Sequence, residues 1–132
     1  NPVEIVKDKH STMVRLWSYQ GMYPVAEIRN ATYQQVENAL GTLAETLPGG
    51  WLSDQVWVTL NSNLRSSVYL KNAIVTTYKY KPLVGIIEMI DPRGKSTYYD
   101  YDVHGRLKEI YIIEGGIKKL LKENEYKYYN EK

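Results

Sequence analysis

The sequence contains no cysteine and no phenylalanine among its 132 residues. Without cysteine, the chain forms no disulfide and offers no thiolate ligand to a metal. No apolar run approaches the roughly 20 residues that a membrane-spanning helix requires. The formal net charge is +2, which gives no basis for nucleic-acid binding. These absences leave a chain of single-domain length with an ordinary hydrophobic fraction of 43%.

Tyrosine is the residue type that the sequence uses most unusually. There are 13 tyrosines and 3 tryptophans. A fully buried core does not need so many hydroxyl groups. Tyrosine suits a β-sheet with one wet face, because the ring packs against neighbours while the hydroxyl finds a partner or water. The aromatic composition therefore predicts a sheet that is only partly covered.

A repeated unit organises the chain. The clearest copy is Tyr99–Ile110, and Tyr78–Met89 lies 21 residues earlier in the same register. Each copy has two aromatic residues two positions apart, then an aliphatic residue, a glutamate and a further apolar residue. A third copy is Trp17–Ile28, and a fourth begins at Tyr126. We expect consecutive β-hairpins, and a fourth copy that is cut short favours an excerpt of a longer array.

Turn residues separate the expected strands. Asp102-Val103-His104-Gly105 suits a type I turn that closes a bulged hairpin, and the carboxylate of Asp102 is expected to cap the backbone amides that follow it. Asp91-Pro92-Arg93-Gly94 is a second turn and Glu114-Gly115-Gly116 a third. Turns at such short intervals predict an antiparallel meander.

The stretch between the first two copies has helical rather than strand periodicity. Thr32 and Gln35 form a capping-box pattern. The apolar positions that follow have helical spacing; they are Val36, Ala39, Leu40, Leu43 and Leu47. Pro48-Gly49-Gly50 ends this first helix. A second, shorter helix is predicted over Asn61–Tyr69, with Leu64 and Val68 on one side.

The stretch Thr97–Leu107 resembles the YD-repeat (Rhs-repeat) family. The family pattern is matched by six residues, namely Tyr99, Tyr101, Asp102, Gly105, Arg106 and Leu107. The other copies depart from the pattern, since Lys81 and Gln20 replace the aspartate. The resemblance implies a piece of a large secreted or cell-surface protein of the kind found in Bacteroides-type bacteria. In that family, many such hairpins form a hollow shell.

Together, these patterns predict an α+β fold in a single domain, 1–132. Residues 1–30 form a degenerate hairpin repeat, residues 31–70 a two-helix insertion packed on one face of the sheet, and residues 71–132 YD-type hairpins. The sheet is expected to be antiparallel throughout.

Candidate catalytic and metal-binding residues are few. Asp100 and Asp102 resemble paired carboxylates, but the turn explains Asp102. His10 and His104 are the only histidines, and no ligand spacing brings them together with carboxylates. We therefore expect a protein without enzymatic activity, cofactor or metal.

The predicted function is structural. Neighbouring repeats of a parent chain are the expected partners, and open edge strands favour self-association. The alternative is a carbohydrate-binding or adhesive module that uses an aromatic ladder to bind a glycan. We define this aromatic ladder as Trp17, Tyr19, Tyr78, Tyr80, Tyr99 and Tyr101. Cross-strand packing of the same rings is the simpler explanation, since such pairs stabilise a sheet by up to roughly 1 kcal/mol each.

Overall fold

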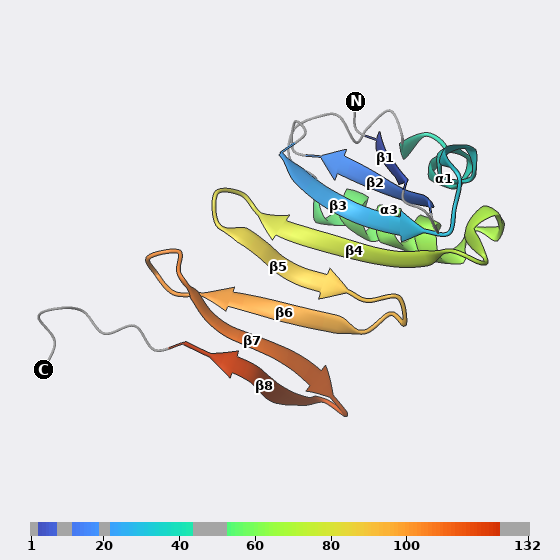
Figure 1. The fold of residues 1–132 in the computed structure, drawn as a ribbon. Coiled ribbons are helices and arrows are strands. Elements are labelled where there is room, and N and C mark those ends of the chain that lie inside the picture. The colour runs from blue at the N-terminus through green and yellow to red at the C-terminus, as the bar shows by residue number, and fades with distance from the viewer. Residues whose placement is uncertain (1–2, 8–11, 19–21, 44–52, 125–132) are drawn as a thin grey trace, which may run out of the picture.

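A computed structural model describes residues 3–7, 12–18, 22–43 and 53–124. The described part has an α+β fold, with one antiparallel sheet and two helices (Figure 1). This confirms the predicted α+β class with an antiparallel sheet and two helices. Several sequence predictions lie outside the described residues; they concern His10, Tyr19, Leu47, the turn at 48–50 and the fourth repeat copy at 126–128.

The sheet is a meander in which every strand pairs with the next one along the chain. Its eight strands are β1 (Val3–Lys7), β2 (Thr12–Ser18), β3 (Tyr23–Arg29), β4 (Ile74–Lys81), β5 (Gly85–Ile90), β6 (Ser96–Tyr101), β7 (Leu107–Glu114) and β8 (Ile117–Glu123). The connection from β3 to β4 contains helix α1 (Tyr33–Leu40), helix α3 (Asp54–Ser66) and the 3-10 turn η1 (Val68–Leu70). The helices are thus an insertion between two neighbouring strands, as the sequence predicts.

Helix α1 begins at the predicted capping box. The backbone N–H of Gln35 donates to Oγ1 of Thr32 at 3.1 Å, and the N–H of Thr32 donates to Oε1 of Gln35 at 2.9 Å. Val36 and Leu40 are buried on the inner side of the helix. Gly41 ends the helix with φ +57°, a conformation that favours glycine. The helix and its start are confirmed, but the prediction that it continues through Leu43 to a stop at 48–50 is wrong, since Gly41 ends it after Leu40.

The second helix was predicted with the wrong boundaries. Helix α3 begins seven residues earlier than Asn61, because Oγ of Ser53 accepts the N–H of Val56 and caps it there. Its other end is at Ser66, since Ser67 is extended and caps the next turn. This break changes the helical phase, so that Val68 is 76% exposed while Leu64 is buried. The prediction that Leu64 and Val68 share one packed side is therefore wrong.

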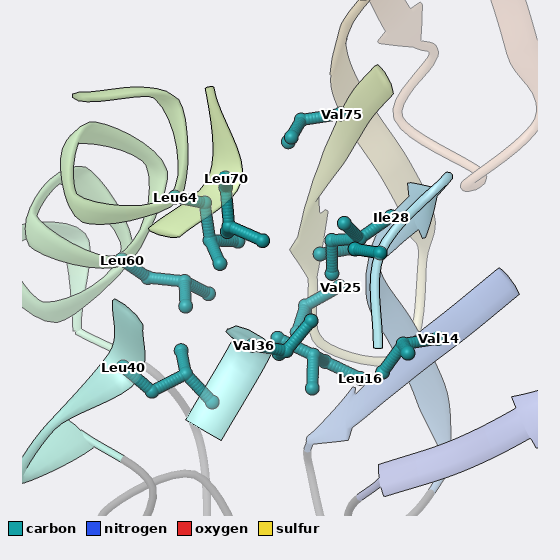
Figure 2. Close-up of a cluster of buried hydrophobic side chains, with 12 residues drawn as sticks. Val14, Leu16, Val25, Ile28, Val36, Leu40, Leu60, Leu64, Leu70 and Val75 are labelled. Atoms are coloured by element: carbon teal, nitrogen blue, oxygen red, sulfur yellow. The ribbon is translucent and has the colours of Figure 1, made fainter. Parts of the chain in front are cut away.

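One face of β2, β3 and the start of β4 packs against α1, α3 and η1. Figure 2 shows apolar side chains from the helices meeting those from the strands. The buried cluster consists of Val14, Leu16, Val25, Ala26, Ile28, Ala31, Val36, Leu40, Leu60, Leu64, Leu70 and Val75. The last member along the chain is Val75, so the hairpins after β4 contribute nothing to this core.

The sheet continues beyond the helices. Strands β5 to β8 extend away from the helical layer (Figure 1). Most side chains of β5, β6 and β7 are half-buried, and all seven residues of β8 are exposed. The predicted two-helix insertion thus lies on one face, but it covers only the first half of the sheet.

Arg65 joins helix α3 to the sheet. Its guanidinium donates to the backbone oxygens of Asp91 and Ile90, both at 2.9 Å, and to Oγ1 of Thr77 at 3.1 Å. Nε donates to Oδ1 of Asn61 at 2.8 Å, and that oxygen also accepts the Thr77 hydroxyl at 2.7 Å. Thr77 is fully buried. A planar guanidinium with five N–H groups suits this set of acceptors, which a lysine cannot satisfy.

We expect Arg65→Met to lower the free energy of unfolding by roughly 3 kcal/mol, because four acceptors at the helix–sheet boundary each lose a hydrogen bond. Urea denaturation followed by far-UV circular dichroism measures the change. Lys108→Met, which removes an exposed cation from β7, is the control and should have little effect. Equal stability of the Arg65 variant and the unchanged chain would contradict this role.

Candidate functional site

The two hairpins that carry the tyrosine repeat have the same geometry. In β4–β5, Tyr78 lies opposite Met89; in β6–β7, Tyr99 lies opposite Ile110. The second tyrosines also correspond, with Tyr80 opposite Ile86 and Tyr101 opposite Leu107. Both hairpins have a bulge just before the second tyrosine, where the second strand carries one extra residue, Ile87 in β5 and Lys108 in β7. The 21-residue period of the sequence is therefore also a period of the sheet register.

The first hairpin, β2–β3, has a different register. Equivalence with the other copies requires Trp17 opposite Ile28, but Trp17 lies opposite Pro24 and Val14 lies opposite Ile28. The bulge falls between Leu16 and Trp17. Here the core sets the pairing, because this bulge allows the adjacent residues Val25 and Ala26 both to be buried under the helices. The copy at Trp17–Ile28 shares the residue pattern but not the pairing.

The second tyrosine of each repeat binds the backbone of the preceding hairpin. The hydroxyl of Tyr80 donates to the carbonyl of Pro24 at 2.8 Å, and that of Tyr101 donates to the carbonyl of Ile86 at 2.6 Å. Tyr80 also stacks on Tyr23, with ring centroids 4.7 Å apart. We call these two hydrogen bonds the tyrosine clasps. Each clasp links one hairpin to the hairpin before it.

Gly85 makes room for the second clasp. A Cβ at this position would lie 3.0 Å from the hydroxyl oxygen of Tyr101, which is closer than real Cβ atoms normally come. Gly85 also has φ +142°, which side-chain-bearing residues rarely adopt. Both the approach of the tyrosine and the backbone conformation favour glycine here. The next repeat has Arg106 at the equivalent position, so the reason for this glycine is visible only in the structure.

The first tyrosines of the repeats lie on the face opposite α3. Thr77 points to α3, so its neighbour Tyr78 points to the opposite face. Tyr78 pairs with Met89, and Met89 pairs with Thr97, so all three side chains share that face. Tyr99 lies two residues after Thr97 and therefore also points there. The hydroxyl of Tyr78 donates to Oε1 of Glu27 at 2.6 Å, and this carboxylate lies 3.6 Å from Arg15. Burial, followed by the bond to Glu27, raises the pKa of Tyr78 well above its usual value.

The described members of the aromatic ladder all contact other parts of the protein, some by hydrogen bonds and others by partial burial. The hydroxyls of Tyr78, Tyr80 and Tyr101 all bind other residues of the protein. Trp17 and Tyr99 are half-buried. Tyr98, which the sequence did not single out, stacks on Tyr111 with centroids 5.3 Å apart. These contacts favour cross-strand packing as the main role of the rings.

Asp102 has the turn role predicted from the sequence. Its Oδ1 accepts the backbone N–H groups of His104 at 2.8 Å and Arg106 at 3.0 Å. Its Oδ2 accepts the Nε–H of Arg106 at 2.9 Å, so the arginine pairs with a carboxylate of its own turn. Gly105 closes the turn with φ +77°. The remaining motif residue, Leu107, pairs with Tyr101.

Asp91 forms the same turn at the other end of the sheet. Its Oδ1 accepts the N–H groups of Arg93 and Lys95, both at 2.9 Å, and Gly94 has φ +84°. The turn between β4 and β5 lacks both aspartate and glycine. There, Leu83 takes the left-handed conformation with φ +64° after Pro82.

No metal or membrane-spanning feature is found in the part of the chain that the structure describes. No three His, Cys, Asp or Glu side chains there are grouped to hold a metal ion. None of the described helices is long and apolar enough to cross a bilayer. The carboxylate of Asp100 accepts the backbone N–H of Tyr101 at 3.1 Å, so both members of the acidic pair at 100 and 102 bind the backbone.

Comparison with known proteins gives no family assignment. No family model matches the sequence, and no curated protein matches it. The resemblance to YD repeats therefore rests on the motif residues alone.

We expect Tyr101→Phe and Tyr80→Phe each to lower the free energy of unfolding by about 1 kcal/mol, because each leaves a backbone carbonyl without its donor. Tyr98→Phe is the matched control, since the Tyr98 hydroxyl makes no hydrogen bond to a described residue. Chemical denaturation of the three variants tests this. The same loss in all three would mean that the clasps contribute nothing specific.

The turn aspartates predict acid destabilisation. The hydrogen bond from Lys95 is the main cause that lowers the pKa of Asp91. Burial opposes the shift at Asp102, but bonds from Arg106 and His104 outweigh it and lower the pKa of this group too. A lowered pKa stabilises the fold above the unfolded value of about 3.9, and this contribution disappears as pH falls through the folded value.

We therefore expect the double variant Asp91→Asn, Asp102→Asn to melt at a lower temperature than the unchanged chain at pH 7. The difference should vanish near pH 2, where the carboxylates are protonated. Glu123→Gln, which replaces an exposed carboxylate without an ion pair to any described residue, controls for a general charge effect. A gap in melting temperature that does not depend on pH would contradict the assignment.

Proposed function

We propose that this chain is a non-catalytic structural module of a secreted or cell-surface protein of the YD-repeat (Rhs-repeat) type. In this proposal, successive hairpins extend one sheet, and the neighbours of the module are further hairpins of the same kind. The observation that carries the proposal is the repetition of the tyrosine clasp together with the register of its hairpin. A contact that recurs once per repeat is suited to building an array.

The exposed end of the sheet supports this function. Strand β8 has no partner on its outer side among the described residues, and all its side chains are exposed. Exposed apolar side chains gather on the last hairpin; they are Ile113, Ile117, Leu120 and Leu121. An edge strand of this kind is a ready template for pairing with another strand.

The acidic residues of the repeats support a structural role rather than a catalytic one. Asp91 and Asp102 each cap a turn with two backbone N–H groups. A general acid or base needs a proton-exchanging group that reaches a substrate. These carboxylates are instead held by the bonds that shape the hairpins.

Carbohydrate binding by the aromatic ladder is the second candidate function. Its support is that Tyr78 and Tyr99 lie on the face opposite α3, with Glu27 and Arg15 beside Tyr78. Aromatic rings beside polar groups are common in sugar sites, since the ring packs while the polar groups bind hydroxyls. The hydroxyl of Tyr78 is already bound to Glu27, which weakens this candidate relative to the structural one.

The structural proposal predicts concentration-dependent association through β8. Glu114 and Ile117 flank a two-residue turn and form a hydrogen-bonded pair, so by alternation the N–H of Leu120 points away from β7. Leu120→Pro removes this outward donor and should weaken association at least about tenfold. Sedimentation velocity at increasing concentration measures the effect.

Leu120→Val keeps the N–H group and is the matched control. It should associate like the unchanged chain, because valine also favours strands. A protein that stays strictly monomeric at millimolar concentration would contradict the structural proposal.

A further inference from the structure

Two hollows lie on either side of Lys71, where the chain passes from η1 into β4. The first has a volume of about 260 Å³ and lies between the end of α3, η1 and the turn from β5 to β6. The second, of about 240 Å³, lies between η1 and the start of α1. Lys71 and Ala73 line both. Each is smaller than the range of about 300–1,000 Å³ that is typical for drug-sized ligands, so each suits one small ring or group.

The first hollow is cationic. Arg65, Lys71 and Arg93 line it over an apolar floor that includes Leu64 and Val75, and no Asp or Glu is among its lining residues. Lys71 makes no hydrogen bond or ion pair to another described residue. Arg93 is 79% exposed and lies 4.0 Å from the Asp91 carboxylate. Two cations are thus available to an incoming anion.

Arg65 contributes less to this first hollow. It has five N–H groups, and four hydrogen bonds within the protein leave one of them for a ligand. Its other bonds hold it against the sheet, so it presents that donor without having to be ordered on binding.

The second hollow is lined by side-chain amides and a tyrosine. Asn30, Gln35 and Asn72 contribute amides, and Tyr69 contributes an exposed ring. The amide nitrogen of Asn30 already donates to the backbone carbonyl of Asn72 at 3.1 Å. The amide of Asn72 makes no hydrogen bond within the described part of the chain, and Gln35 uses only its Oε1, in the capping box. Free amides both donate and accept, which is what sugar hydroxyl groups require. The tyrosine ring offers a flat apolar surface.

We propose that the two hollows together bind a short acidic saccharide, a uronic acid joined to a neutral or N-acetylated sugar. The uronate carboxylate pairs with Lys71 and Arg93 in the first hollow, since charge-assisted hydrogen bonds are the strongest available there. The second sugar occupies the amide-lined hollow against Tyr69. This site lies apart from the aromatic ladder and does not depend on association through β8, so each proposal is testable without the other.

The test is a titration of the whole chain with a disaccharide of glucuronic acid and N-acetylglucosamine, followed by amide chemical shifts. Saturable shifts around residues 69–73 and 93–94 are expected. The methyl ester of the disaccharide, which lacks the charge, should bind at least about tenfold more weakly, as should the Lys71→Met variant. Arg93→Gln is a second variant that leaves the buried contacts of the region in place. Lys108→Met, remote in β7, should bind normally.

Three results would overturn the proposal. The first is the absence of saturable shifts into the millimolar range. The second is inorganic sulfate binding as tightly as the disaccharide with no effect of Asn72→Ala, which would reduce the site to a plain anion site. The third is binding that is lost in Trp17→Ala but kept in Lys71→Met, which would place the sugar on the aromatic ladder instead.

Discussion

The burial of one face of β2–β4 beneath α1 and α3 is the contact on which the rest of the structure depends. It supplies the only continuous apolar core among the described residues, and that core ends at Val75. At about 25 cal/mol per Å² of apolar surface, such burial is the main stabilising contribution in a domain of this size. Arg65 fixes the helical layer to the sheet through three hydrogen bonds, to Thr77 and to the backbone of Ile90 and Asp91. The later hairpins therefore extend from a first half of the sheet that packing against the helices stabilises.

Beyond the core, the sheet relies on local contacts that recur. Aspartate-capped turns set both ends of the β5–β7 meander, and the tyrosine clasps join each hairpin to the one before it. On the last hairpins, Tyr98 stacks on Tyr111, and the ammonium of Lys118 lies 4.4 Å from the centre of the Tyr111 ring while also pairing with Glu109 at 2.8 Å. Such contacts are individually modest, so a sheet built from them gains from further neighbours.

The two functional proposals use different parts of the molecule. The repeated hairpins and the exposed strand β8 carry the structural proposal, while the hollows beside Lys71 carry the saccharide proposal. The hollows lie where the helical insertion meets the sheet, and this region is outside the repeat pattern. An array module with a binding site on its insertion is physically consistent, because the β4–β5 and β6–β7 hairpins after the insertion keep the same register.

The sequence by itself determined the features that depend on neighbouring residues. The capping box at Thr32, the aspartate turns and the equal registers of the two tyrosine hairpins follow from local hydrogen bonding and from strand alternation. Only the tertiary structure decided the shifted register of β2–β3, because burying Val25 and Ala26 together outweighs the repeat pattern. It also decided the half-covered sheet and the hollows beside Lys71. These arise from contacts between segments far apart in the chain, which no local pattern records.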